Sequence, residues 1–228
     1  MDLSVSVRNK TLLHGVSFKA PDSECTGVVG PNGSGKTILL ESIMGLHSSS
    51  GSVLFGSNDL HAMDFCGEGI YYVPEIFPSF DMTVRRNLEF FYRCYNRGNV
   101  SGMDKEIDEI LDAVRLRGRE DSPVDFLSLG LRRRLAYATT MVSVPSLLVM
   151  DEPFANLDAD GREYLGGYLR TLKLLGTTMV IASNDLAELE RVCDSIVFMN
   201  RGYMVENARM TEGTRLREAC LSTIWRWT

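Results

Sequence analysis

Eight residues, Gly30-Pro31-Asn32-Gly33-Ser34-Gly35-Lys36-Thr37, match the phosphate-loop pattern G-x-x-x-x-G-K-[ST] at every fixed position. Glycines let the backbone curl until its N–H groups point at phosphate oxygens, and the helix that follows presents its positive N-terminal end. In this pattern the lysine reaches the β- and γ-phosphates and the hydroxyl residue ligates Mg²⁺. The sequence therefore predicts a nucleotide site with contacts from Gly30, Asn32, Gly33, Ser34, Gly35, Lys36 and Thr37.

Short apolar runs alternate with helical patterns on both sides of this loop, which predicts an α/β architecture. The expected strands are residues 26–29, 70–73, 147–150, 178–182 and 196–199. Between them, residues 75–144 show helical periodicity instead, and the third helix expected there runs over residues 128–142 with Ser128 as its N-cap. We expect one domain over residues 1–228, with a core lobe of residues 1–74 and 145–206, a helical subdomain of residues 75–144, and a tail of residues 207–228.

The composition is that of an ordinary globular protein, with 44% hydrophobic and 24% charged residues. The formal net charge of −6 argues against a nucleic-acid partner, because such proteins usually carry a basic surface. No stretch reaches the roughly 18 consecutive apolar residues that a membrane-spanning helix needs. Any membrane role is therefore expected to be peripheral.

Two carboxylates follow the apolar run at residues 147–150. A buried strand would carry Asp151 to the edge of the sheet beside the phosphate loop, where it can hold Mg²⁺. Glu152 would then face the γ-phosphate and act as a general base toward the attacking water. The alternative, a solvated acidic turn at a strand end, loses weight because the phosphate loop is present in the same chain.

Further motifs stand in an order that resembles the ABC ATPase family over nearly the whole chain. The resembling segments, in chain order, are Leu13–Phe18 before the phosphate loop, Tyr72–Glu75 (Q-loop), Leu127–Leu131 (signature), Ala155–Asp158 (D-loop), Ser183–Asp185 (switch) and Asn200–Gly202. The nearest likeness is to motor subunits of exporters for drugs, polysaccharides or haem. The resemblance implies an α/β phosphate-loop core of ABC type, with an antiparallel β edge and an inserted helical subdomain.

The resemblance also implies how such a chain works. Two ATPase subunits, alike or different, would form a head-to-tail dimer that binds ATP and Mg²⁺ at its interface. Ser128 and Gly130 would contact the γ-phosphate from across the interface, and Glu75 would join Thr37 and Asp151 at the metal. ATP hydrolysis would drive a separate integral membrane permease, with this chain at the cytoplasmic face of the membrane.

Several positions depart from the family pattern. Asn184 stands in place of the switch histidine, and an amide can hydrogen-bond but cannot carry a proton. Glu75 replaces the usual glutamine, Ile38 replaces a second hydroxyl residue, and Leu129 replaces the first signature glycine. Val7 occupies the place of the aromatic residue that normally stacks on adenine. We expect either a working but slow ATPase, or a weakened subunit that pairs with a competent one.

Two further hypotheses stay open at this point. One is a soluble ABC ATPase that acts on nucleic acid, ribosomes or cluster assembly, although the tandem domains and basic extensions usual in that class are absent from this sequence. The other is a nucleotide-gated binding module with negligible turnover, which the replacement at Asn184 keeps open.

Overall fold

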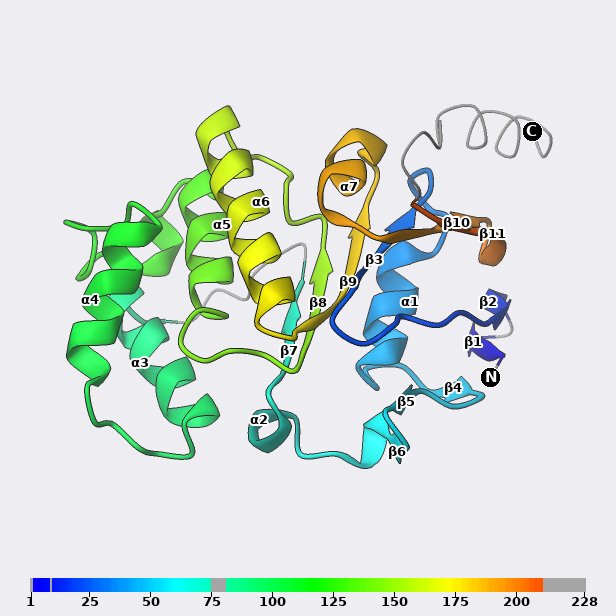
Figure 1. The fold of residues 1–228 in the computed structure, drawn as a ribbon, viewed down its shortest axis with the longest axis horizontal. Helices are drawn as coiled ribbons and strands as arrows, with labels where there is room; N and C mark the ends of the chain where they lie inside the picture. Colours follow the sequence, from blue (N-terminus) through cyan, green and yellow to red (C-terminus); the bar gives the residue numbers. More distant parts are fainter. Residues whose placement is uncertain (1, 9, 75–80, 211–228) are drawn as a thin grey trace.

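The computed structural model describes residues 2–8, 10–74 and 81–210. Its core is a six-stranded sheet in the order β11-β10-β3-β9-β8-β7 (Figure 1). The neighbouring strands from β10 to β7 pair in parallel, and only β11 is antiparallel, at the edge. The strand bounds are β3 Cys25–Val29, β7 Ile70–Val73, β8 Leu147–Asp151, β9 Thr178–Ser183, β10 Ser195–Asn200 and β11 Tyr203–Arg209.

The central strands are mostly apolar and are buried along their whole length, because both faces of the sheet are covered. Every residue of β3, β8 and β9 is buried. The pairing places Val29 opposite Ser183 and Asp151 opposite Ala182, so the carboxyl ends of these three strands meet at one edge. Ligand sites of open α/β sheets lie at this edge.

One face of the sheet is covered by α1 (Lys36–Ile43) and a small antiparallel sheet. That sheet has the order β2-β1-β4, with β1 at Leu3–Val7, β2 at Lys10–Val16 and β4 at Ser49–Ser50. The short hairpin β5 (Leu54–Phe55) and β6 (Asn58–Asp59), the 3₁₀ turn η1 (Leu60–Ala62) and α2 (Phe65–Glu68) lead from β4 to β7.

The other face is covered by α6 (Ala159–Leu174) and α7 (Leu186–Val192), which pack apolar residues onto the sheet. Asp158 caps α6 by accepting from the Gly161 N–H, and Asp185 caps α7 by accepting from the N–H groups of Ala187 and Glu188. These caps fix where each helix starts after its strand.

Three helices lie between β7 and β8 and form the end of the molecule away from the small sheet (Figure 1). They are α3 (Val84–Tyr95), α4 (Met103–Ala113) and α5 (Leu129–Ala138), with the 3₁₀ turn η2 (Val124–Phe126) before α5. Thr83 caps α3, and Ser128 caps α5 by accepting from the Leu131 N–H. Ser128 was the expected cap, so that prediction is confirmed.

The predicted α/β architecture, with its antiparallel edge and helices between strands, is confirmed. The third predicted helix ends at Ala138 rather than reaching residue 142, since Thr139 and Thr140 turn their hydroxyls back onto the carbonyls of Ala136 and Tyr137. Strand β11 continues to Arg209, three residues beyond the expected core lobe, because its pairing with β10 extends to Ser195. The rest of the expected tail, residues 211–228, lies outside the described residues.

Candidate active site

The phosphate loop joins the buried end of β3 to the first turn of α1. Gly35 precedes the helix with φ 102°, a conformation that L side chains rarely adopt. At Gly30 a Cβ atom would lie 2.3 Å from the Met199 carbonyl oxygen, so only glycine fits there. The local structure therefore needs glycine at the two fixed positions of the pattern, 30 and 35.

A hairpin turn closes the back of this loop. The Gly202 N–H, between β10 and β11, donates to the Ser34 carbonyl at 2.8 Å. The Gly202 carbonyl accepts from the His14 N–H of β2 at 2.9 Å. The loop is thus held between the main sheet and the small sheet, which keeps its backbone N–H groups in a fixed arrangement.

The Lys36 side chain lies inside the loop and is only 7% exposed. Its Nζ donates to the Gly30 carbonyl at 2.8 Å and lies 3.7 Å from Glu152 Oε1. A buried ammonium at this point is a fixed positive charge facing the carboxylate that the sequence predicts as the base. It is placed to bind an anionic group that enters the loop.

Thr37 and Asp151 meet across the sheet edge. The Thr37 hydroxyl donates to Asp151 Oδ2 at 2.6 Å, and Asp151 is buried at the end of β8. The two groups, a hydroxyl and a carboxylate, both offer hard oxygen ligands of the kind that Mg²⁺ takes alongside phosphate oxygens. The pair therefore fits the predicted metal role. Glu75, the third predicted metal ligand, lies outside the described residues.

Glu152 follows Asp151 with a strained backbone at φ 46°, and its N–H donates to the Ala182 carbonyl at 2.8 Å. Its Oε2 accepts from the Ser183 hydroxyl at 3.1 Å. Burial raises the pKa of the Glu152 carboxyl, and the Lys36 ammonium and the Ser183 hydroxyl offset part of that rise. A raised pKa brings a carboxylate closer to what a general base near neutral pH requires.

Asn184 lies directly after β9 at the rim of the site. It is exposed, and its Nδ2 donates to Asn32 Oδ1 at 3.5 Å, the outer limit of a hydrogen bond. The amide is thus near the phosphate loop but is weakly held.

One cavity of about 500 Å³ gathers most of the predicted residues. Its lining consists of Leu12, Asn32, Gly33, Gly35, Lys36, Thr37, Ile38, Glu152, Ala155 and Asn184. Gly30 and Ser34 form the loop beneath it, and Asp151 reaches it through Thr37. Val7, the expected place of an adenine-stacking aromatic, is not in the lining and is 44% exposed on β1. Leu12 of β2 lines the cavity, and nothing in the sequence pattern pointed to it.

The two signature residues, Ser128 and Gly130, are not part of this lining. Ser128 is exposed at the N-terminus of α5, and a Cβ atom at Gly130 would lie 3.3 Å from the carbonyl oxygen of Asn156. The signature thus borders the segment Ala155–Asp158. Their expected nucleotide contact from across a dimer interface stays a prediction.

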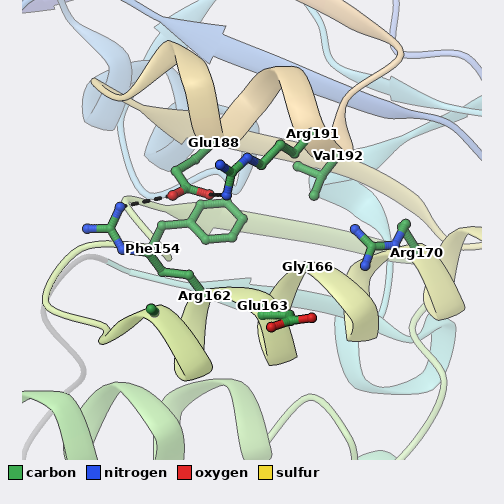
Figure 2. A pocket seen from close by; sticks show the side chains of 9 residues that line it. Phe154, Arg162, Glu163, Gly166, Arg170, Glu188, Arg191 and Val192 are labelled. Carbon is green, nitrogen blue, oxygen red and sulfur yellow. Dashed lines mark hydrogen bonds and ion pairs between the residues drawn. The ribbon is translucent and has the colours of Figure 1, made fainter.

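A larger cavity, about 660 Å³, lies between α6 and α7 (Figure 2). Phe154 and Gly166 line it together with charged side chains, among them Arg162, Glu188 and Arg191. It carries no phosphate loop and no strand-end carboxylate, so its chemistry differs from that of the first cavity. The described residues contain no group of three or more histidine, cysteine, aspartate or glutamate side chains that could hold a metal ion.

Comparison with known proteins agrees with this geometry. Residues 13–155 match a protein family described as ABC transporter. The chain is 31% identical over 215 residues to the Nod factor export ATP-binding protein I of Ralstonia nicotianae, which covers 89% of this chain and 64% of that relative. It is 32% identical over 208 residues to the protein of the same name from Rhizobium meliloti, covering 90% of this chain and 62% of that relative. The chain thus spans less than two thirds of the length of these relatives.

A solved structure described as the ATP binding subunit of an ABC transporter superposes with a TM-score of 0.86. It is 22% identical, and the match covers 97% of both chains. At this identity the likeness shows the fold. The predicted phosphate-loop core of ABC type is thereby confirmed.

Proposed function

The chain belongs to the ABC transporter family, and from this premise we propose that it is an ATP-binding and hydrolysing motor subunit that drives a separate membrane permease. The observation that carries the proposal is the cavity in which Lys36, Thr37 and Glu152 meet at one sheet edge. A phosphate-binding loop with a carboxylate base beside it is the equipment for transferring a phosphoryl group to water.

In the proposed reaction, the loop N–H groups and Lys36 bind the β- and γ-phosphates of ATP. Thr37 and Asp151 would hold Mg²⁺, which neutralises charge on the phosphates when bound. Glu152 accepts the proton of the attacking water, and the products are ADP and phosphate. Asn184 offers one neutral N–H donor toward the phosphoryl oxygens. The Lys36 charge and the buried setting of Glu152 support this assignment of roles.

We further propose that two ATPase subunits close over the nucleotide, with Ser128 and Gly130 of the partner subunit completing each site. The exposed N-terminus of α5 supports this, because it presents N–H groups that a second chain's nucleotide can reach. The two relatives carry the word export in their name, which supports an exporter here. None of the helices in the described residues is long and apolar enough to cross a membrane. The partner that the proposal requires is a separate integral membrane permease, with this chain bound to it at the cytoplasmic face of the membrane.

One observation favours a second candidate, a mainly nucleotide-binding subunit paired with a fully competent one. Asn184 is exposed, and its one contact to the phosphate loop is 3.5 Å long. A side chain held so loosely contributes less to a fixed transition-state site than a well-placed donor does.

The decisive experiment compares MgATP binding and steady-state hydrolysis in the parent chain and Lys36→Ala. Loss of the buried ammonium should weaken MgATP binding at least tenfold, about 1.4 kcal/mol, in calorimetry. Lys105→Ala is the matched control, because Lys105 is an exposed residue of α4 whose ion pair is with Glu109. Equal affinity of Lys36→Ala and the parent would refute the nucleotide site.

A second experiment separates the transporter from the other hypotheses. The chain is expressed natively and recovered from membranes in mild detergent, where a multi-spanning protein should co-purify and stimulate hydrolysis. Recovery with polysomes or DNA would favour a soluble ABC ATPase instead. Binding of MgATP with no hydrolysis, alone or with the permease, would favour the nucleotide-gated module.

A further inference from the structure

Ser183 stands at the end of β9, one residue before the switch position, and is 2% exposed. We propose that Ser183 is a positioning residue for Glu152, which fixes the direction of the carboxylate that faces the nucleotide cavity. The inference rests on the proposed role of Glu152 as base. It adds a residue that does not itself touch the nucleotide.

The hydrogen bonds at Ser183 leave its hydroxyl a single arrangement. The hydroxyl oxygen accepts from the Asp185 N–H at 3.1 Å. A hydroxyl has one proton, and an ionised carboxylate can only accept, so that proton is donated to Glu152 Oε2, 3.1 Å away. The backbone turn after β9 thereby sets the direction in which the hydroxyl points.

The two oxygens of Glu152 are held by different elements. Oε2 is bound to Ser183 of β9, whereas Oε1 lies 3.7 Å from Lys36 Nζ in the phosphate loop. Ser183 therefore keeps one oxygen engaged and leaves the other turned toward the loop. Without the hydroxyl, the backbone N–H of Asn184 is left to hold the carboxylate on this side. The carboxylate can then turn and pair more closely with Lys36, away from the water it must activate.

The turn that orients Ser183 is itself braced by Arg162 of α6. The Arg162 guanidinium donates to Glu188 Oε1 at 2.9 Å, as Figure 2 shows, and lies 3.6 Å from Asp185 Oδ2. Its Nε donates to the Leu157 carbonyl at 3.2 Å, in the segment that follows Glu152. Arg162 thus ties the chain after Glu152 to the chain after Ser183, and the relative placement of the two is fixed from both sides.

A merely structural role for Ser183 makes a different prediction. If the hydroxyl only satisfies a buried strand end, its removal lowers stability but leaves the titration of Glu152 unchanged. If it positions Glu152, its removal also takes away a hydrogen bond to the charged form of that carboxyl, which raises the pKa of Glu152 further. The acid limb of the rate profile then moves to higher pH, because the base must be ionised to act.

The test uses the full chain with Ser183→Ala and the nearly isosteric pair Ser183→Thr and Ser183→Val, which differ in the hydroxyl. We expect Ser183→Ala and Ser183→Val to lower kcat about tenfold, with little change in ATP affinity, and to shift the acid limb upward. Ser183→Thr should restore both. Ser195→Ala is the control, because Ser195 is a buried serine at the first residue of β10, two strands away from β9 and at the opposite edge of the sheet from Ser183.

A direct readout does not need turnover. In protein labelled with ¹³C at the glutamate carboxyls, the Glu152 resonance is the one lost in Glu152→Gln, and its titration should move to higher pH in Ser183→Val but not in Ser183→Thr. Unchanged titration of Glu152 and unchanged kcat in Ser183→Val would overturn the positioning role. If Glu152→Gln is inactive in the same series, the proposed function is unaffected by that result. Full activity in Glu152→Gln would overturn the proposed base itself, and with it this inference.

Discussion

The phosphate loop, residues 30–37, follows β3, and the switch segment, Ser183–Asp185, begins at the last residue of β9. The two strands are neighbours, and Val29 pairs with Ser183. The loop is held by the hairpin turn behind it, whose Gly202 N–H donates to the Ser34 carbonyl. It is also held by the Lys36 ammonium, which donates to the Gly30 carbonyl within the loop. The middle residue of the switch segment, Asn184, is exposed, and its side-chain amide donates to Asn32 Oδ1 at the long distance of 3.5 Å. We therefore expect the phosphate loop to bind ATP well and the loosely held Asn184 to contribute little to the transition state. Affinity and turnover should respond to different mutations.

The largest effect is expected for Glu152→Gln, which keeps the shape of the side chain but removes its basicity. Turnover should fall by about 10²- to 10⁴-fold, the usual contribution of a general base, while MgATP still binds. An ATP-bound dimer should then accumulate in gel filtration, either of two copies or with a partner chain. Turnover equal to that of the parent would show that the base lies elsewhere.

Asn184→His tests the switch segment directly. Losing one transition-state donor typically costs about 2.7–4 kcal/mol, or roughly 10²–10³ in rate. The histidine should therefore raise kcat by up to about 10²-fold in the isolated chain and leave ATP affinity nearly unchanged. In a complex with a competent partner subunit the gain should be small, because the partner's site carries the flux. A parent chain already at ordinary transporter rates, and not improved by histidine, would contradict the expected weakness.

Gly202→Ala tests the support of the phosphate loop by the hairpin turn behind it. Gly202 has φ +83°, and an added Cβ would lie 2.2 Å from the Leu12 carbonyl oxygen. We expect a loss of about 1–3 kcal/mol in the free energy of unfolding, measured by urea denaturation, together with weaker ATP binding. Gly56→Ala is the matched control, with φ +61° and nothing within 4 Å of the added atom. Equal losses in the two variants would mean that strain at positive φ, and not support of the loop, explains the effect.

The smallest effect is expected for Leu12→Ala, at the wall of the cavity. Removing part of an apolar surface that faces the bound nucleotide should weaken ATP binding by about 1 kcal/mol, roughly fivefold, with kcat unchanged. Leu46→Ala serves for comparison, because Leu46 is exposed and outside this lining. A change in kcat with no change in ATP affinity would show that Leu12 acts on the hydrolysis step and not on nucleotide binding.

The sequence predicted most of the core because its signals are local. The run at residues 147–150 became β8 with Asp151 at its end, and Lys36 and Thr37 opened α1, as expected. The helix α6, which no pattern had singled out, has Leu165, Leu169 and Leu172 at helical spacing after the Asp158 cap. Val7, which holds the place of the stacking aromatic in the family pattern, does not line the cavity, whereas Leu12 of β2 does.

By itself the sequence determined the chemistry of each position: glycines where the loop must turn, a lysine and a threonine at the helix start, two carboxylates at a strand end, and an asparagine directly after another strand. Only the tertiary structure decided which of these groups meet. Ser183 and Glu152 are 31 residues apart in the chain, and they bond because β8 and β9 are parallel neighbours in register. Strand order and register arise from packing over the whole sheet, so no local pattern contains them. The direction of the Glu152 carboxylate follows from that long-range arrangement.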